Sequence, residues 1–132
     1  MKKMLYILIV LVVIVIIVAV LSNKLLIKDL STPQITSVDS VFFTDIQVEP
    51  HLFKAKIILG TSTDIVSDCN IEINNRKIII TIYSHYFMSE NEGTKSQEQI
   101  SYRTDMSQID SIVVKDTTRQ KVLWDRQQGI VW

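Results

Sequence analysis

Few side chains in this sequence could carry out chemistry, and the most reactive are one cysteine and two histidines: Cys69, His51 and His85. A thiol beside an imidazole can form a nucleophilic dyad. However, the alternation of residues around Cys69 directs its side chain inward among isoleucines, where a thiol behaves as a small apolar group and its pKa rises. We therefore expect Cys69 to be a core residue.

The sequence does not contain a recognisable metal or catalytic motif. A structural zinc ion needs four ligands at short paired spacings, and Asp39, Asp45 and Glu49 lack the close spacing of a calcium loop. There is no G-x-S-x-G elbow and no glycine-rich phosphate loop, and three glycines leave little room for one. We expect no metal, no cofactor and no catalysis.

The segment best suited to binding is Tyr83-Ser84-His85-Tyr86-Phe87, at the end of an isoleucine-rich stretch. If the isoleucines at even positions face the core, Tyr83, His85 and Phe87 lie on the opposite face of the strand. Another strand or loop could cover this row as a second core layer. Alternatively, the three residues form a partner-binding patch, in which Tyr and His supply contact area and a polar tip. A small enzyme with His85 as acid or base is a further alternative.

The elements that position these residues are predicted to be strands, because apolar and polar residues alternate over most of the chain after residue 36. Residues 41–49 and 53–59 are expected to form an antiparallel hairpin around Pro50, with acidic residues facing Lys54 and Lys56 across its solvent face. The residues expected on the other, apolar face are Phe42, Thr44, Ile46 and Val48 in the first strand, and Phe53, Ala55, Ile57 and Leu59 in the second.

A second hairpin is predicted around Asn74-Asn75, because asparagine tolerates the positive φ of tight turns. This turn pairs Glu72 with Lys77 and Ile71 with Ile78, with Cys69 on the core face. Further strands are expected at residues 100–104, 111–116 and 121–126, with Val122 and Trp124 facing inward. The remaining expectations are a mobile loop at 89–99, one helical turn at 105–110 that directs Met106 and Ile109 inward, and an apolar edge element at 129–132.

The N-terminal segment predicts a membrane anchor. Residues 4–21, from Met4 to Leu21, form an uncharged run of 18 residues behind Lys2 and Lys3. Such a run covers most of a hydrocarbon core about 30 Å thick when it is helical. A cleaved signal peptide is the alternative, but its apolar stretch is typically shorter. Basic residues at the start favour a cytoplasmic N-terminus.

The domains expected are a cytoplasmic stub at 1–3, an anchor helix at 4–21, a tether at 22–36 and one extracytoplasmic domain at 37–132. From Leu30 onward ten basic and thirteen acidic residues leave a net charge of −3, which gives no reason to bind nucleic acid. With one cysteine, an intrachain disulfide is impossible. We expect a mainly β protein, an antiparallel β-sandwich or partly open barrel.

The expected function is that of a binding or accessory module. It would act by contact with a protein partner at the cell surface. Membership of a multispan membrane assembly, in which the helix itself makes the contacts, is an alternative. The apolar run lacks the small-residue spacing that favours tight helix pairing, so we interpret it as a simple anchor.

Overall fold

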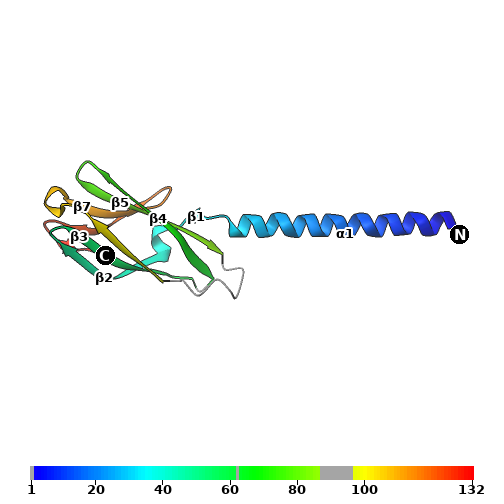
Figure 1. Ribbon diagram of the computed structural model, residues 1–132, viewed down its shortest axis with the longest axis horizontal. Coiled ribbons are helices and arrows are strands. Elements are labelled where there is room, and N and C mark those ends of the chain that lie inside the picture. The colour runs from blue at the N-terminus through cyan, green and yellow to red at the C-terminus, as the bar shows by residue number, and fades with distance from the viewer. Residues whose placement is uncertain (1, 62, 87–96) are drawn as a thin grey trace. The chain divides into compact units, whose positions relative to one another are not determined.

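The computed structural model describes residues 2–61, 63–86 and 97–132, which form one long helix and a mainly β unit (Figure 1). The chain divides into two compact units, residues 1–32 and 33–132. The helix α1 spans Lys2–Ser31, 30 residues, or about 45 Å at 1.5 Å per residue. Its window Tyr6–Leu25 is long and apolar enough to cross a membrane, and none of it is buried within the protein.

The helix extends well beyond the predicted anchor, into the segment 22–36 that the sequence analysis assigns to a tether. The helix continues without interruption to Ser31, and Gln34–Ile35 forms a short strand, β1. Ser22, Asn23 and Lys24 are polar, but they follow an established helix, and adding a residue to an existing helix costs far less than starting one. Most of the segment is therefore helical, and its role as a tether stays a prediction.

The β unit contains two sheets. The larger has the order β1-β5-β7-β8-β9, with β4 pairing with β5, and the smaller has the order β2-β3-β6. The longer strands are β2 (Val41–Glu49), β3 (Leu52–Leu59), β4 (Asp64–Asn74), β5 (Lys77–Tyr86), β6 (Gln97–Arg103), β7 (Ser111–Lys115) and β8 (Gln120–Asp125). The last strand, β9, is Gly129–Ile130, and two 3₁₀ helices, η1 (Val38–Ser40) and η2 (Met106–Gln108), lie between strands.

The first predicted hairpin is present, but its first strand changes face midway. The register of β2 and β3 shifts between Thr44 and Gln47, and Asp45 has a φ of 52°. Before this bulge Phe43 is buried and Phe42 is exposed; after it the even positions turn inward. The prediction that Phe42 and Thr44 face the core is therefore wrong, because one extra residue reverses the alternation. In β3 the predicted inward residues are all buried.

The second predicted hairpin turns one residue later than expected. Asn74 pairs with Lys77, so the turn residues are Asn75 and Arg76, with φ values of 49° and 63°. Ile71 pairs with Ile80 instead of Ile78, a slip of two residues that leaves every side chain on its predicted face. The Arg76 guanidinium binds Asp110 through two hydrogen bonds of 2.9 Å.

One strand pairing is parallel, which corrects the expectation of a wholly antiparallel fold. β5 and β7 pair in parallel from Lys77 with Ser111 to Ile80 with Val114. Between them the chain crosses to the other sheet as β6 and returns, and such a crossover lets two strands run in the same direction. Three consecutive residues of β7, Ile112, Val113 and Val114, are at most 1% exposed, because this strand is covered on both faces.

The later elements agree with the sequence in most respects. Met106 and Ile109 are buried at and just after η2, and β9 pairs with β8 at the predicted C-terminal edge. In β8 the inward residue is Leu123, whereas Val122 is 40% exposed and Trp124 is half-buried, so the prediction for Val122 is wrong. A register shift opposite Ile112 and Val113 causes this change. Of the expected loop 89–99, residues 97–99 belong to β6 and the rest lie outside the described residues.

The two sheets share one hydrophobic core. β3 contributes Phe53 and Ile57, and β5 contributes Ile78, Ile80 and Ile82, each at most 1% exposed. Residues of β2, β6, β7 and β8 and of both 3₁₀ helices complete the same cluster. No disulfide contributes to this core, since Cys69 is the chain's single cysteine.

Candidate functional site

The row of residues predicted on the outer face of β5 is only partly described. Tyr83 and His85 lie on the face opposite the buried Ile82 and Ser84, as predicted, and both are half-buried. Tyr83 is flanked by Ile35 of β1 and Asp68 of β4. Phe87 lies outside the described residues. The row therefore stays a predicted partner-binding patch, and its two described members are neither open to solvent nor part of the main core.

Cys69 and His85 do not form a dyad. Cys69 pairs with Ile82 and packs against the core, whereas His85 lies on the other face of β5. Burial raises the pKa of the Cys69 thiol to about 11, with smaller contributions from the negative charges of Asp68 and Glu98. The prediction of an inward, poorly ionised thiol is confirmed, although the residue is half-buried and not fully enclosed.

A groove with an apolar floor lies beside the C-terminal residue, and we call it the Trp132 groove. It encloses about 500 Å³ and is lined by Asp39, Val41, Phe42, Lys121, Val122, Val131 and Trp132. The Trp132 ring packs edge-on against Phe43, with 5.1 Å between ring centroids. Phe42 lies over Gly60, where an added Cβ would be 3.0 Å from the Phe42 ring. Tertiary packing thus positions the Trp132 ring, whereas half of Phe42 is exposed.

Charged groups of both signs form the rim of the Trp132 groove. Lys121 Nζ lies 3.1 Å from Asp39 Oδ1 and 5.3 Å from the centre of the Trp132 ring. Arg119 also pairs with Asp39. Hydrogen bonds from Lys121 and then Arg119 hold the pKa of Asp39 below its ordinary value. Asp39 therefore remains a carboxylate at neutral pH.

A buried carboxylate fixes the loop behind this rim. Asp116 is 6% exposed and accepts hydrogen bonds from the backbone amides of Thr118 (2.8 Å), Val38 (3.1 Å) and Arg119 (2.7 Å). These amides, with Thr118 contributing most, hold the pKa of Asp116 well below its ordinary value. The bond to Val38 connects the turn after β7 to η1, which carries Asp39. Asp116 thus positions the charged groups of the rim.

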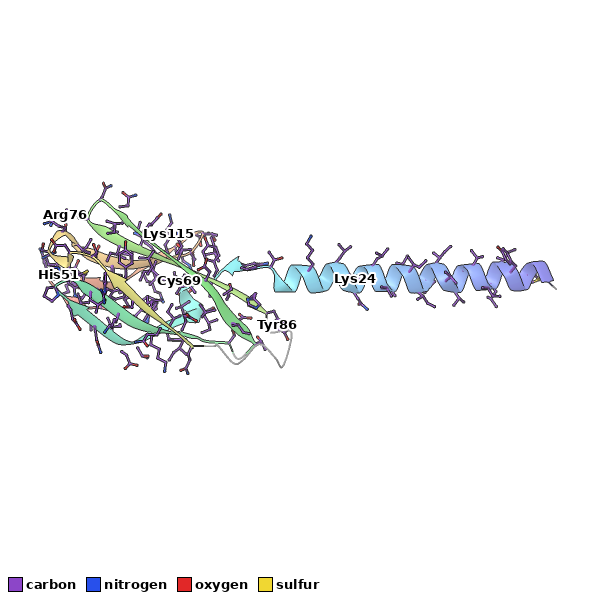
Figure 2. The ribbon with its side chains drawn as sticks, viewed as in Figure 1. Lys24, His51, Cys69, Arg76, Tyr86 and Lys115 are labelled. Carbon is purple, nitrogen blue, oxygen red and sulfur yellow. The ribbon has the colours of Figure 1, made fainter. Side chains whose placement is uncertain are left out.

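A second groove, which we call the Trp124 groove, is more polar. It encloses about 570 Å³ and is lined by Val48, Glu49, Pro50, His51, Asp105, Met106, Ser107, Trp124 and Arg126. His51 lies at the same end of the β unit as Arg76, away from Tyr86 (Figure 2). Hydrogen bonding by the Ser107 side chain and then its backbone amide, together with weaker attraction from His51 and Arg126, lowers the pKa of Asp105.

Sequence reasoning did not find either groove. Each is assembled from segments distant in the chain: β2, β8 and the C-terminal residues in one, and the β2–β3 turn, η2 and the end of β8 in the other. His85, the candidate acid or base, lines neither of them, so catalysis by His85 stays a prediction. Across residues 2–61, 63–86 and 97–132, no three His, Cys, Asp or Glu side chains are grouped to hold a metal ion.

Comparison with known proteins gives no assignment. No protein-family model, no curated protein sequence and no solved structure matches this chain.

Proposed function

We propose that this chain is a membrane-anchored binding module whose β unit, a β-sandwich, acts outside the cytoplasm by contact with a protein partner and without catalysis. The observation that carries the proposal is an exposed apolar patch at the Trp132 groove. Its members are Phe42 (52% exposed), Val122 (40%) and Val131 (46%), which line this groove together. Gathered apolar residues with a charged rim are typical of protein contact surfaces.

The chemistry of the patch indicates which side chains the partner would place against it. The floor suits an aliphatic or aromatic side chain, and Asp39 and Lys121 suit polar groups of either sign around it. Since the Trp132 ring packs edge-on against Phe43, this ring needs little ordering on binding. The row of Tyr83 and His85 is a second candidate surface for the same function.

The anchor supports the location in this proposal. α1 contains an exposed apolar window of 20 residues, and Lys2 and Lys3 precede it, which favours a cytoplasmic N-terminus. Protease added to intact cells should degrade the β unit, and the mass of the surviving N-terminal fragment should show that α1 is retained. Degradation only after lysis would contradict the orientation, and loss of α1 from the mature protein would indicate a cleaved signal.

The contact surface is tested by a matched pair of variants. A photo-cross-linking residue at Phe42, compared with one at Tyr83, identifies the partner in the native membrane. The purified partner is then titrated against the purified full chain. Val131→Asp should weaken binding at least about tenfold, which is about 1.4 kcal/mol. Ile73→Asp, on β4, should not, although Ile73 is as exposed as Val131 (45% and 46%).

Equal effects of the two substitutions would contradict the proposed surface. Adducts from Tyr83 but not from Phe42 would transfer the function to the predicted row on β5. Since both variants place a carboxylate at a half-exposed apolar position, a general loss of solubility would affect them alike.

A further inference from the structure

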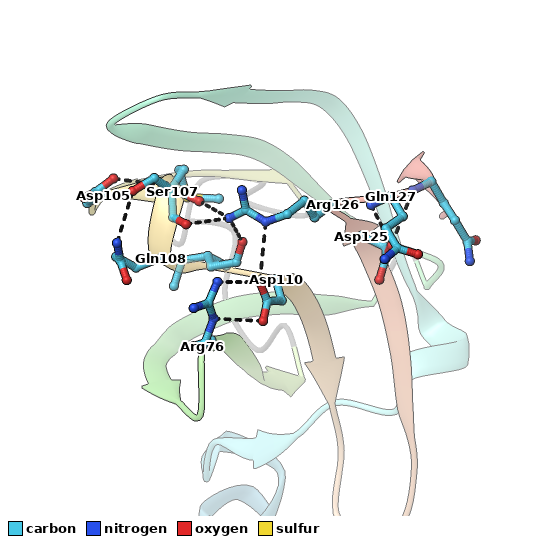
Figure 3. A network of polar contacts seen from close by, with 11 residues as sticks. Arg76, Asp105, Ser107, Gln108, Asp110, Asp125, Arg126 and Gln127 are labelled. Atoms are coloured by element: carbon cyan, nitrogen blue, oxygen red, sulfur yellow. Dashed lines mark hydrogen bonds and ion pairs between the residues drawn. The ribbon is translucent and has the colours of Figure 1, made fainter.

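The Trp124 groove is built on a rigid frame. Met106 N donates a hydrogen bond of 2.9 Å to Pro50 O, which ties η2 to the β2–β3 turn. Arg126 Nη2 donates to the backbone oxygens of Met106 (2.7 Å), Ser107 (2.9 Å) and Ile109 (Figure 3). A carboxylate supports this arrangement, because Asp110 Oδ1 lies 3.4 Å from Arg126 Nε. The walls of the groove are therefore positioned before any ligand arrives.

One donor of this frame remains available. Arg126 uses Nη2 and Nε in the contacts above, and Nη1 makes no hydrogen bond within the part of the chain that the structure describes. In Figure 3 this nitrogen points away from the three carbonyl groups. The side chain is 42% exposed and lines the groove. An arginine held in this way offers its remaining N–H groups at little entropic cost.

The other polar groups of the groove include both donors and acceptors. Glu49 and Asp105 are exposed carboxylates that accept, whereas His51 can donate; the Ser107 hydroxyl already bonds to Asp105. Trp124 is half-buried and adds an indole to the lining. An anionic ligand would be repelled by the carboxylates of Glu49 and Asp105, and a cationic ligand by the guanidinium of Arg126. A hydroxyl group both donates and accepts, so a neutral polyhydroxylated ligand satisfies the mixed lining.

We propose that the Trp124 groove binds a neutral saccharide, with hydroxyl groups on Arg126, Glu49 and Asp105 and an apolar C–H face against Trp124. The groove is open to solvent, and most of its hydrogen bonds replace bonds to water. We therefore expect a dissociation constant on the order of 1 mM for a short oligosaccharide. Many anchored copies on one polymeric glycan would bind more tightly through multivalency.

The chain supplies its own internal control for the experiment. It contains two tryptophans, Trp124 and Trp132, and each lines one of the two grooves. The full chain, with ¹⁵N-labelled indoles, is placed in phospholipid nanodiscs free of sugar detergents. Tetramers of β-1,4-linked N-acetylglucosamine, of β-1,4-linked glucose and of α-1,4-linked glucose are titrated to about 20 mM, well above the expected dissociation constant.

At least one neutral tetramer should shift the Trp124 indole resonance saturably and leave that of Trp132 in place. Glu49→Gln and His51→Ala change exposed side chains and should each weaken binding at least about fivefold, while Phe42→Ala in the other groove should not. The proposal is overturned if no tetramer shifts the Trp124 resonance, if both indoles shift together, or if both variants bind as the wild type does.

A charged competitor separates ligand classes. If an oligosaccharide of glucuronate binds and no neutral tetramer does, the groove is an anion site and the proposal for a neutral ligand is wrong. The Trp124 groove shares no residue with the apolar patch of Phe42, Val122 and Val131. If saccharide binding fails, the proposed protein contact is not contradicted. If the protein contact fails, the proposed saccharide site is likewise not contradicted.

Discussion

Replacing each of two adjacent phenylalanines tests the β2 bulge directly. Phe43 is 6% exposed and packs edge-on against Trp132, whereas Phe42 is 52% exposed. Phe43→Ala removes a buried aromatic ring and should lower the free energy of unfolding by about 3–5 kcal/mol. Phe42→Ala removes a ring that is half in solvent and should cost about 1 kcal/mol, roughly half of the transfer free energy of a fully buried ring.

Urea unfolding of the full chain in nanodiscs, followed by tryptophan fluorescence, measures both variants. With a slope of about 1–3 kcal/mol per M, the Phe43→Ala midpoint should fall by about 1–5 M and that of Phe42→Ala by at most about 1 M, and at any one slope the first shift should be about three to five times the second. Uninterrupted alternation along residues 41–49 predicts the reverse order, because it places Phe42 inward. If Phe42→Ala is as costly as Phe43→Ala, the assignment of the bulge to Asp45 is refuted.

Three further perturbations follow from buried groups. Backbone amides lower the pKa of Asp116, so the stability that this carboxylate contributes is present above its unfolded pKa of about 3.9 and is lost as the pH falls below that value. Asp116→Asn should therefore flatten the decrease in melting temperature measured between about pH 5 and 2. Cys69, with a pKa of about 11, should react with iodoacetamide about 100-fold more slowly at pH 8 in the folded protein than in urea, and equal rates would contradict its burial. Val113→Ala should cost about 1–3 kcal/mol in denaturant unfolding, although alternation places Val113 outside, and a neutral effect would show that β7 is open on that face.

Much of the fold follows from local rules. In β3, Phe53, Ala55, Ile57 and Leu59 alternate without interruption, and all four are buried. The 3₁₀ helix at Met106 and the C-terminal edge strand at Gly129 also lie where spacing and composition predict them. These elements are predictable because neighbouring residues in the chain suffice to set the face that each side chain occupies.

The errors occur where distant residues decide the local geometry. In the second hairpin, Arg76 of the turn pairs with Asp110, which is 34 positions away in the chain. The bulge at Asp45 reverses the face of Phe42. The continuous apolar run of β7, from Ile112 to Val114, was the available signal for a strand covered on both sides, since alternation is lost when both faces are buried.

By itself, the sequence determined an apolar helix long enough to cross a membrane, a mainly β unit and an inward cysteine, because each depends on composition or on spacing within a few residues. The tertiary structure decided the location of the candidate sites. Trp132 lines one groove with Phe42 and Lys121, and Trp124 lines the other with His51 and Arg126, only after the chain has crossed between its two sheets. The two grooves arise from contacts between distant segments, and the spacing of apolar residues in the sequence does not reveal such contacts.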